Sequence, residues 1–202
     1  MEILEIIITG VFSLSVALSS IWLKHILEVR SKNKEKESRE NLSNDEINIM
    51  FEIQVFLNEF IKKNKLDRLC VFQFHNGGTF FKGIPMRKYS QTFEALGCGV
   101  AGVKKINQDI LITEDPLLIK ILNENDFFVI DGNDEKLDYI RNKIEENGIL
   151  QMIIAPIRTL SGQLIGFIQI HSVKHKIEIT EDLKNEVLDL VLKLSGYLIV
   201  VK

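Results

Sequence analysis

One stretch of the chain combines strand-forming residues with polar side chains at regular spacing. Residues 67–76 read DRLCVFQFHN and end at Gly77-Gly78, a pattern typical of a β-strand followed by a turn. Successive side chains of a strand point to opposite faces of the sheet. Gln73 and His75 therefore share one face, and Asn76 belongs to the other face with the neighbouring phenylalanines.

A second apolar run repeats this arrangement. Residues 163–171 contain Gln169 and His171, which also share a face. Polar side chains inside an apolar sheet need hydrogen-bond partners or water. Two interpretations follow. Either these side chains border a polar ligand pocket, or they are hydrogen-bonded strand ends with exposed polar tips.

A third strand candidate, residues 84–94, adds cationic groups. Strict alternation would give it one face with four side chains, Arg87, Tyr89, Gln91 and Phe93, and the opposite face with four others, Lys88, Ser90, Thr92 and Glu94. Arg87 or Lys88 could hold a phosphate or a carboxylate. The alternative is an edge strand that its charges protect from pairing with another chain.

Few residues support an enzyme. His171 and His175 are four apart, but they fall at a strand end rather than on one helix face, so no metal site is expected. A thiol-dependent reductase is the minor alternative, and it would need an accessible, low-pKa cysteine with a resolving partner. Cys70 lies in the middle of a predicted strand and Cys98 in a loop. No catalytic-triad order, phosphate-binding glycine loop or paired carboxylates stand out. We expect a protein that is not an enzyme.

Composition limits the partners. The 202-residue chain has a net charge of −3 and 46% hydrophobic residues, which suits one anchor and one packed domain. The predicted domain carries no long basic stripe, so nucleic acid is not an expected partner. Two cysteines do not form a disulfide framework.

The first segment predicts a membrane anchor. Residues 6–23, IIITGVFSLSVALSSIWL, form an uncharged run of 18 positions, which as a helix would span about 27 Å, close to the hydrocarbon thickness of a bilayer. A buried core helix and a cleaved signal peptide are the alternatives, although no basic residue precedes the run as a signal peptide requires. Six lysines and arginines follow within residues 24–40, whereas only Glu2 and Glu5 precede the run. The positive-inside rule therefore places the N-terminus outside and the C-terminal domain in the cytoplasm.

The sequence thus divides into an anchor (1–24), a charged helical linker (25–42) and a domain (43–202). The linker lacks glycine and proline, and its charges alternate in sign, which favours a solvated helix. It lacks the sustained heptad repeat of a coiled coil.

The domain alternates helix and strand patterns. A capping box at Ser43 to Glu46 opens a helix that runs to about residue 63. Asp115-Pro116 opens a shorter helix, and Thr180 begins a closing helix. The remaining elements are a strand over 127–131, a helix over 135–146 and strands over 151–158 and 163–171. Short connections predict an antiparallel sheet, hence an α/β (α+β) domain whose first and last amphipathic helices cover a sheet face.

This order resembles the GAF family of sensory domains over residues 43–202. The most specific likeness is the pair of strands Ile154-Ala155-Pro156-Ile157-Arg158 and Gln163-Leu164-Ile165-Gly166-Phe167-Ile168, with its proline, turn and "IG" start. The related PAS-like fold is the main alternative. The resemblance implies about six antiparallel strands and terminal helices packed together, often in a dimer. It also implies a ligand pocket, when present, on the other sheet face.

Together these features predict a membrane-anchored GAF-like sensory or regulatory module. It would bind a small cytoplasmic ligand, form a homodimer through its terminal helices and signal to a partner protein. The alternative is a ligand-free structural or adaptor protein that presents an interaction surface at the membrane. The sequence does not identify a cofactor. The candidate ligand-binding residues are Gln73, His75, Asn76, Phe80, Arg87, Tyr89 and Gln169.

Overall fold

The structure is a computed structural model of the whole chain. It describes residues 44–79, 85–132 and 146–200, together with residues 24, 26, 30 and 144. The chain divides into two compact units, residues 1–47 and 48–202. The predicted anchor at 6–23 and most of the linker lie outside the described residues. Among the residues that the structure does describe, no helix is long and apolar enough to cross a bilayer.

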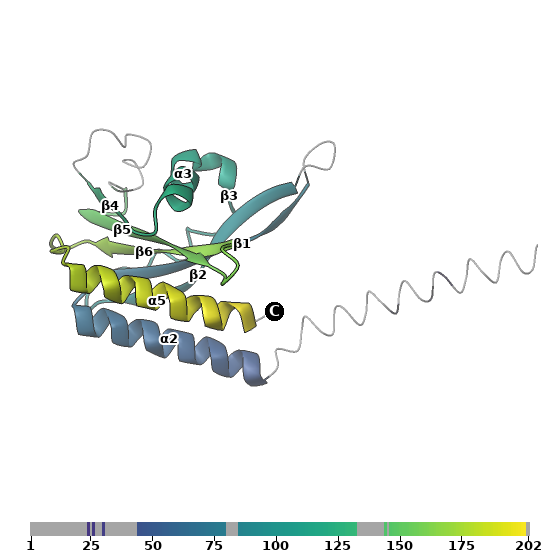
Figure 1. Cartoon of the computed structure of the whole chain (residues 1–202), viewed down its shortest axis with the longest axis horizontal. Helices are drawn as coiled ribbons and strands as arrows, with labels where there is room; N and C mark the ends of the chain where they lie inside the picture. The colour runs from purple at the N-terminus through teal and green to yellow at the C-terminus, as the bar shows by residue number, and fades with distance from the viewer. Residues whose placement is uncertain are drawn as a thin grey trace, which may run out of the picture. The chain divides into compact units, whose positions relative to one another are not determined.

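A single antiparallel sheet forms the middle of the domain (Figure 1). Its six strands follow the order β3-β2-β1-β6-β5-β4, so the first strand in the sequence lies beside the last one. The strands are β1 (Arg68–Thr79), β2 (Pro85–Leu96), β3 (Ile110–Leu111), β4 (Phe128–Asp131), β5 (Gln151–Arg158) and β6 (Leu164–Ser172). This confirms the antiparallel sheet of six strands. The short β3 has no signal of its own in the sequence.

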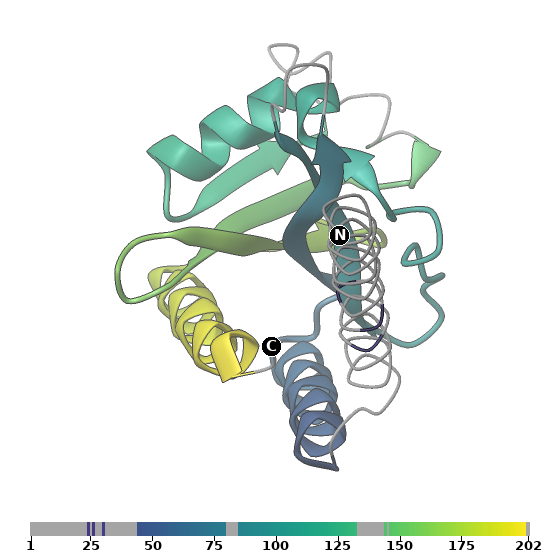
Figure 2. The same ribbon diagram turned by 90° about the vertical axis from the view of Figure 1, so that its right-hand side faces the viewer.

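Helices cover both faces of the sheet. The long helices α2 (Asn44–Asn64) and α5 (Glu181–Val200) lie side by side on one face (Figure 1). The other face carries α3 (Pro116–Glu124), which follows a short 3₁₀ turn, η2 (Ile112–Glu114) (Figure 2). Thr180 begins α5 as predicted, because its hydroxyl accepts a hydrogen bond from the Leu183 N–H at 3.1 Å.

The face toward α2 and α5 is mostly aliphatic, with a few aromatic side chains such as Phe60 and Phe93. Ile53 and Leu57 of α2 and Val187 and Leu194 of α5 are fully buried against it. The alternation of β1 contributes Leu69 and Val71 to this core and turns Cys70 and Phe72 to the other side. Burial of these apolar side chains contributes to the hydrophobic stabilisation of the domain.

A β-bulge in β2 changes which side chains share a face. Val71 pairs with Phe93, but the next residue, Phe72, pairs with Gln91, so Thr92 has no partner on β1. Phe93 consequently packs with the α2/α5 core, whereas Tyr89 packs on the α3 side. The prediction that Arg87, Tyr89, Gln91 and Phe93 share one face was therefore wrong for Phe93, because strict alternation ignores the inserted residue.

The "IG" start of β6 has a steric cause. A Cβ atom added to Gly166 would lie 2.2 Å from the carbonyl oxygen of Phe72 on β1. Gly166 lies opposite Gln73 on β1 and Ile157 on β5, so it is enclosed by backbone on both sides. Only a residue without a side chain permits this approach of two strands.

We expect Gly166→Ala to reduce the free energy of unfolding by about 2–4 kcal/mol, because backbone must move to accept the methyl group. Gly196 is the matched control, since a Cβ there meets no atom within 4 Å. Gly196→Ala lies inside α5 and should raise stability by about 0.5–1 kcal/mol. Urea unfolding of both variants measures this. Equal effects of the two substitutions would contradict the close approach.

Candidate functional site

A small cavity lies between the sheet and α3. Its volume is about 50 Å³, and side chains from β1, β2, β5 and β6, from α3 and from the loops beside them line it. Seven of the lining residues are apolar: Phe72, Val103, Ile110, Leu118, Ile149, Met152 and Ile154. Six are polar: Tyr89, Asn107, Asp115, Asn147, Gln169 and His171. This mixture differs from the aliphatic face beneath α2 and α5.

A buried arginine organises one wall of the cavity. Arg68, at the start of β1, is only 2% exposed. Its Nε and Nη2 donate to the carbonyl oxygen of Ala101 at 3.1 and 2.8 Å, and its Nη1 lies 3.2 Å from His171 Nδ1. No carboxylate in the described part of the chain lies within ion-pair distance of it. Arg68 therefore joins the loop after β2 to the end of β6 through neutral acceptors.

This contact fixes the state of His171. A guanidinium only donates hydrogen bonds, so Nδ1 of His171 must accept, and the ring proton of the neutral imidazole lies on Nε2. Nε2 then donates to Gln169 Oε1 at 3.2 Å. Burial, and secondly the positive charge of Arg68, lower the pKa of His171 to about 3. His171 is thus a neutral, oriented group beside the cavity.

A tyrosine and an aspartate also line the cavity. The hydroxyl of Tyr89 donates to Asp115 Oδ2, and both side chains are buried. Asp115 precedes α3 and lines the cavity at the point where Pro116 begins the helix. The Tyr89 ring packs edge-on against Phe72 and Phe167, with centroids 5.8 and 5.3 Å away, and this holds its hydroxyl in place.

A third polar contact links the cavity to the loop after β2. Asn107, which lines the cavity, donates from Nδ2 to Gln91 Oε1 at 2.9 Å. Gln91 is 1% exposed, and its Nε2 has no hydrogen-bond partner within the described structure. An unsatisfied buried donor is costly, so a water bound to this amide would stabilise the fold, although Gln91 itself does not line the cavity.

The structure separates the residues predicted to bind a ligand. Tyr89 and Gln169 line the cavity beneath α3. Gln73 and His75 lie on the same side of β1 as Leu69 and Val71, which is the side facing away from this cavity. Asn76 and Arg87 are exposed and pair with each other farther along the β1–β2 ribbon, and Phe80 lies outside the described residues.

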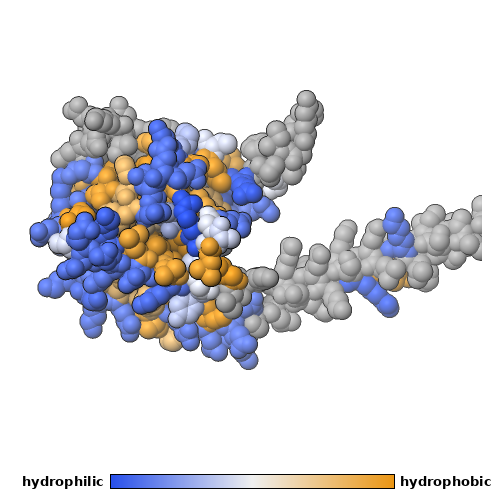
Figure 3. Space-filling model, in the orientation of Figure 1, coloured by the Kyte–Doolittle hydropathy of each residue, from blue (hydrophilic) through white to orange (hydrophobic). Residues whose placement is uncertain are grey.

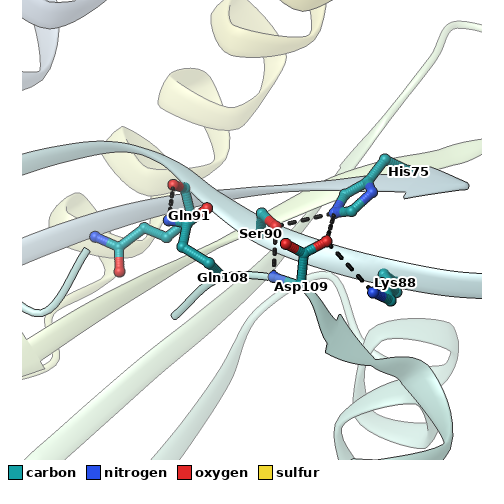
Figure 4. A network of polar contacts seen from close by, with 6 residues as sticks. All are labelled: His75, Lys88, Ser90, Gln91, Gln108 and Asp109. Atoms are coloured by element: carbon teal, nitrogen blue, oxygen red, sulfur yellow. Dashed lines mark hydrogen bonds and ion pairs between the residues drawn. The ribbon is translucent and has the colours of Figure 1, made fainter. Parts of the chain in front are cut away.

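His75 belongs to a separate polar network, shown in Figure 4. Its Nε2 lies 2.9 Å from Ser90 Oγ and 4.0 Å from Asp109 Oδ1, and Lys88 Nζ lies 3.5 Å from the same Asp109 oxygen. Gln108 Nε2 donates to the backbone oxygen of Gln91 at 2.9 Å. These contacts fasten the β1–β2 ribbon to the end of the 97–109 loop.

The meeting of Ser90, His75 and Asp109 is not a hydrolase triad. In a triad, serine contacts one imidazole nitrogen and the carboxylate contacts the other, which orients the ring and stabilises its charge. Here Ser90 and Asp109 both lie nearest to the same ring nitrogen of His75, Nε2. The Ser90 hydroxyl also accepts a hydrogen bond from the Asp109 N–H at 2.8 Å. The arrangement is therefore structural.

Cys70 and His171 do not support a thiol nucleophile or a metal site. Cys70 is fully buried, and burial raises the pKa of its thiol far above its usual value, so it is not a low-pKa nucleophile. Both ring nitrogens of His171 are occupied, which leaves none for a metal. The described residues contain no group of three histidine, cysteine or acidic side chains that would hold a metal ion.

Residues that sequence patterns missed supply most of this site. Arg68, Asp115 and Asn107 gave no signal of a binding site, and only their polar partners in the folded chain identify them. An arginine at the start of a strand and an aspartate before a proline are ordinary in sequence, so no signal pointed to them.

The fold agrees with the expected family likeness, whereas sequence comparison finds nothing. No family model and no characterised protein sequence matches the chain. A far-red cyanobacteriochrome photoreceptor is similar, with a TM-score of 0.55 and 14% identity over 89% of this chain and 98% of the other. The GAF domain of PixJ from Thermosynechococcus elongatus has a TM-score of 0.56 and 13% identity over 80% and 90% of the two chains.

A GAF domain region of a Geobacter sulfurreducens protein is also similar, with a TM-score of 0.51 and 19% identity over 77% of this chain and 98% of the other. At these identities the likeness shows the fold alone, and that fold is GAF-like. The names of these structures describe photoreceptors and GAF domains.

The buried neutral histidine predicts how stability depends on pH. The unfolded chain protonates His171 near pH 6.5, whereas the folded chain resists protonation down to about pH 3. The neutral His171 ring therefore contributes fully to the free energy of unfolding above pH 6.5. This contribution is lost progressively between pH 6.5 and 3, by at most about 1.4 kcal/mol per pH unit.

Chemical unfolding at pH 7 and pH 5 measures this dependence. We expect His171→Gln, whose amide oxygen can still accept from Arg68, to flatten the loss of stability between the two pH values. His175→Gln, at an exposed histidine, should retain the original slope. If both variants keep that slope, His171 is not the buried neutral group described here.

Proposed function

We propose that this GAF-fold chain is a membrane-anchored sensory or regulatory module that binds a small polar ligand beneath α3 and signals to a partner protein. Residues 6–23 would form the anchor, with the N-terminus outside and the domain in the cytoplasm. The proposed anchor and its orientation rest on the uncharged run and the basic residues that follow it.

The polar lining of the cavity carries the ligand-binding part of the proposal. Polar side chains that hydrogen bonds hold in place line one small space: Tyr89 and Asp115, Gln169 and His171, and Asn107. Ligand sites typically combine an apolar lining with a few placed polar groups. These polar groups would not make an ordinary hydrophobic core more stable than apolar side chains would, because each buried polar group needs a hydrogen-bond partner.

Volume limits the kind of ligand. An engineered cavity of about 150 Å³ holds benzene, and drug-sized ligands need about 300 Å³ or more. The cavity here is about 50 Å³, so in this conformation it admits only a compact molecule of a few non-hydrogen atoms. The bilins named for some similar structures are far larger. We therefore infer a small polar metabolite or ion rather than a chromophore.

The same volume is the observation that favours the alternative function. A cavity of this size also suits a few ordered waters bound to its polar lining residues. In that case the fold would serve as a ligand-free adaptor, and its function would lie in its surfaces.

A thermal-shift screen of the full chain against small acids, amines, amides and polyols tests ligand binding. A molecule that binds only the folded state raises the melting temperature. Tyr89→Phe removes the cavity hydroxyl and keeps the ring, and we expect it to reduce the shift by about half or more, because a buried hydrogen bond contributes about 1 kcal/mol.

Tyr197→Phe, on α5 and away from the cavity, should leave the shift unchanged. If no compound stabilises the wild-type chain, the adaptor function is favoured. A shift of equal size in both variants would place the ligand elsewhere.

The outer face of the two long helices supports the proposed homodimer. Figure 3 shows hydrophobic side chains among hydrophilic ones over the region where α2 and α5 lie. Phe51 of α2 is 68% exposed and Leu192 of α5 is 61% exposed, with Met50, Val55 and Ile199 also exposed. Glu186 fixes the two helices to each other, because it accepts hydrogen bonds from Lys63 and Asn64, both at 3.0 Å. Pairing of two copies would cover this apolar stripe.

Cell fractionation followed by light scattering in detergent tests the anchor and the dimer. We expect the full chain in the membrane pellet and the solubilised protein at twice the monomer mass. Phe51→Asp should shift that mass to the monomer, whereas Leu160→Asp, at an exposed turn, should not. Recovery in the soluble fraction would contradict the anchor, and a dimer that survives Phe51→Asp would contradict the helix interface.

A further inference from the structure

A second hollow lies at the far end of α2 and shares no lining residue with the cavity beneath α3. Its volume is about 420 Å³, which is within the range of small-molecule sites. Three parts of the chain form its walls: the end of α2, the turn after β2 and the segment after β6.

The charges around this hollow are mostly positive. Lys62, Lys65 and Lys174 line it, with His175 beside them. A single carboxylate, Asp67, faces these lysines, although the chain as a whole has a net charge of −3. Cations thus gather here against the overall charge of the protein.

The lysines of the hollow differ from their neighbours in their partners. Lys63 forms an ion pair with Glu186 at 3.0 Å, and Lys176 forms one with Asp131 at 2.6 Å. Within the described residues, Lys62, Lys65 and Lys174 have no carboxylate partner, and Lys174 Nζ donates only to the carbonyl oxygen of Cys98. Three lysines without an ion-pair partner among the described residues line this hollow and outnumber its carboxylate, so their charge raises the local concentration of anions.

Asp67 offsets one of the three lysine charges and also holds the hollow in shape. It is 6% exposed, and its Oδ2 accepts the N–H groups of Val173 and Lys174 at 2.7 and 2.8 Å. Its backbone oxygen accepts the Gly97 N–H at 2.7 Å. One residue therefore fixes the segment that carries Lys174 and His175 to the turn that carries Cys98.

We propose that this hollow, lined by Lys62, Lys65, Lys174 and His175, is a binding site for a small phosphate-bearing anion with at least two negative charges. Lysine binds phosphate as a point charge, and an anion of this kind would satisfy several ammonium groups at once.

Cys98 provides a reporter inside the hollow. It is exposed, whereas Cys70, the other cysteine of the chain, is fully buried and will not react in the folded protein. Modification rates of Cys98 with a negatively charged and a positively charged methanethiosulfonate reagent, measured on the full chain in detergent, therefore report the local potential. The probe ligand is inorganic pyrophosphate, with sodium chloride at equal ionic strength as the control.

We expect the negative reagent to react faster, and the ratio of the two rates to fall about tenfold in the double variant Lys65→Gln/Lys174→Gln. Pyrophosphate should slow labelling of the wild type and not of this variant. Lys104→Gln/Lys105→Gln is the matched control, because these lysines are exposed on the neighbouring loop and do not line the hollow, and it should behave as wild type.

A second variant, Lys62→Gln/Lys65→Gln, retains the Lys174 contact to Cys98 and should also lower the rate ratio. The test therefore remains valid even if Lys65→Gln/Lys174→Gln folds poorly. Equal rate ratios in the hollow and control variants would overturn the site. Labelling that pyrophosphate does not slow at matched ionic strength would overturn it as well.

Discussion

The buried guanidinium of Arg68 is the constraint on which the polar side of this domain depends. A charge removed from water must find acceptors, and removing those acceptors leaves an uncompensated charge at a cost of several kcal/mol. Arg68 finds the Ala101 carbonyl and the His171 ring. The contact with Ala101 positions the loop that carries Val103 and Asn107. The contact with His171 orients Gln169 through the second ring nitrogen. The cavity lining on that side follows from one side chain.

The two faces of the sheet therefore differ in polarity, and this difference suggests a different role for each face. The face beneath α2 and α5 is mostly aliphatic, and the two long helices bury it. The face beneath α3 retains a small space with oriented polar groups. Binding there would act on strands whose other side chains pack against both long helices, because residues of β1 and β6 alternate between the two cores.

Periodicity and turn residues predicted most of the fold but only part of the site. The helices, β5 and the start of α5 had clear local signals, such as Pro116 and Thr180. The bulge at Thr92, the two-residue β3 and the side of the sheet on which a pocket opens have none, because they depend on pairing between distant strands. Gln73 and His75 share a face as predicted, yet that face is opposite the cavity. Gln169 and Tyr89 lie at the cavity, whereas Arg68 and Asp115 became visible only through their partners.

The protonation state of His171 tests the role of Arg68 most directly. Nitrogen-15 NMR of the imidazole reports which ring nitrogen carries the proton and at what pH the ring titrates. We predict a neutral ring, protonated at Nε2 and accepting at Nδ1, that does not titrate between about pH 8 and pH 5. A ring that titrates near its ordinary pKa, or that carries its proton on Nδ1, would show that Arg68 does not organise this face of the sheet.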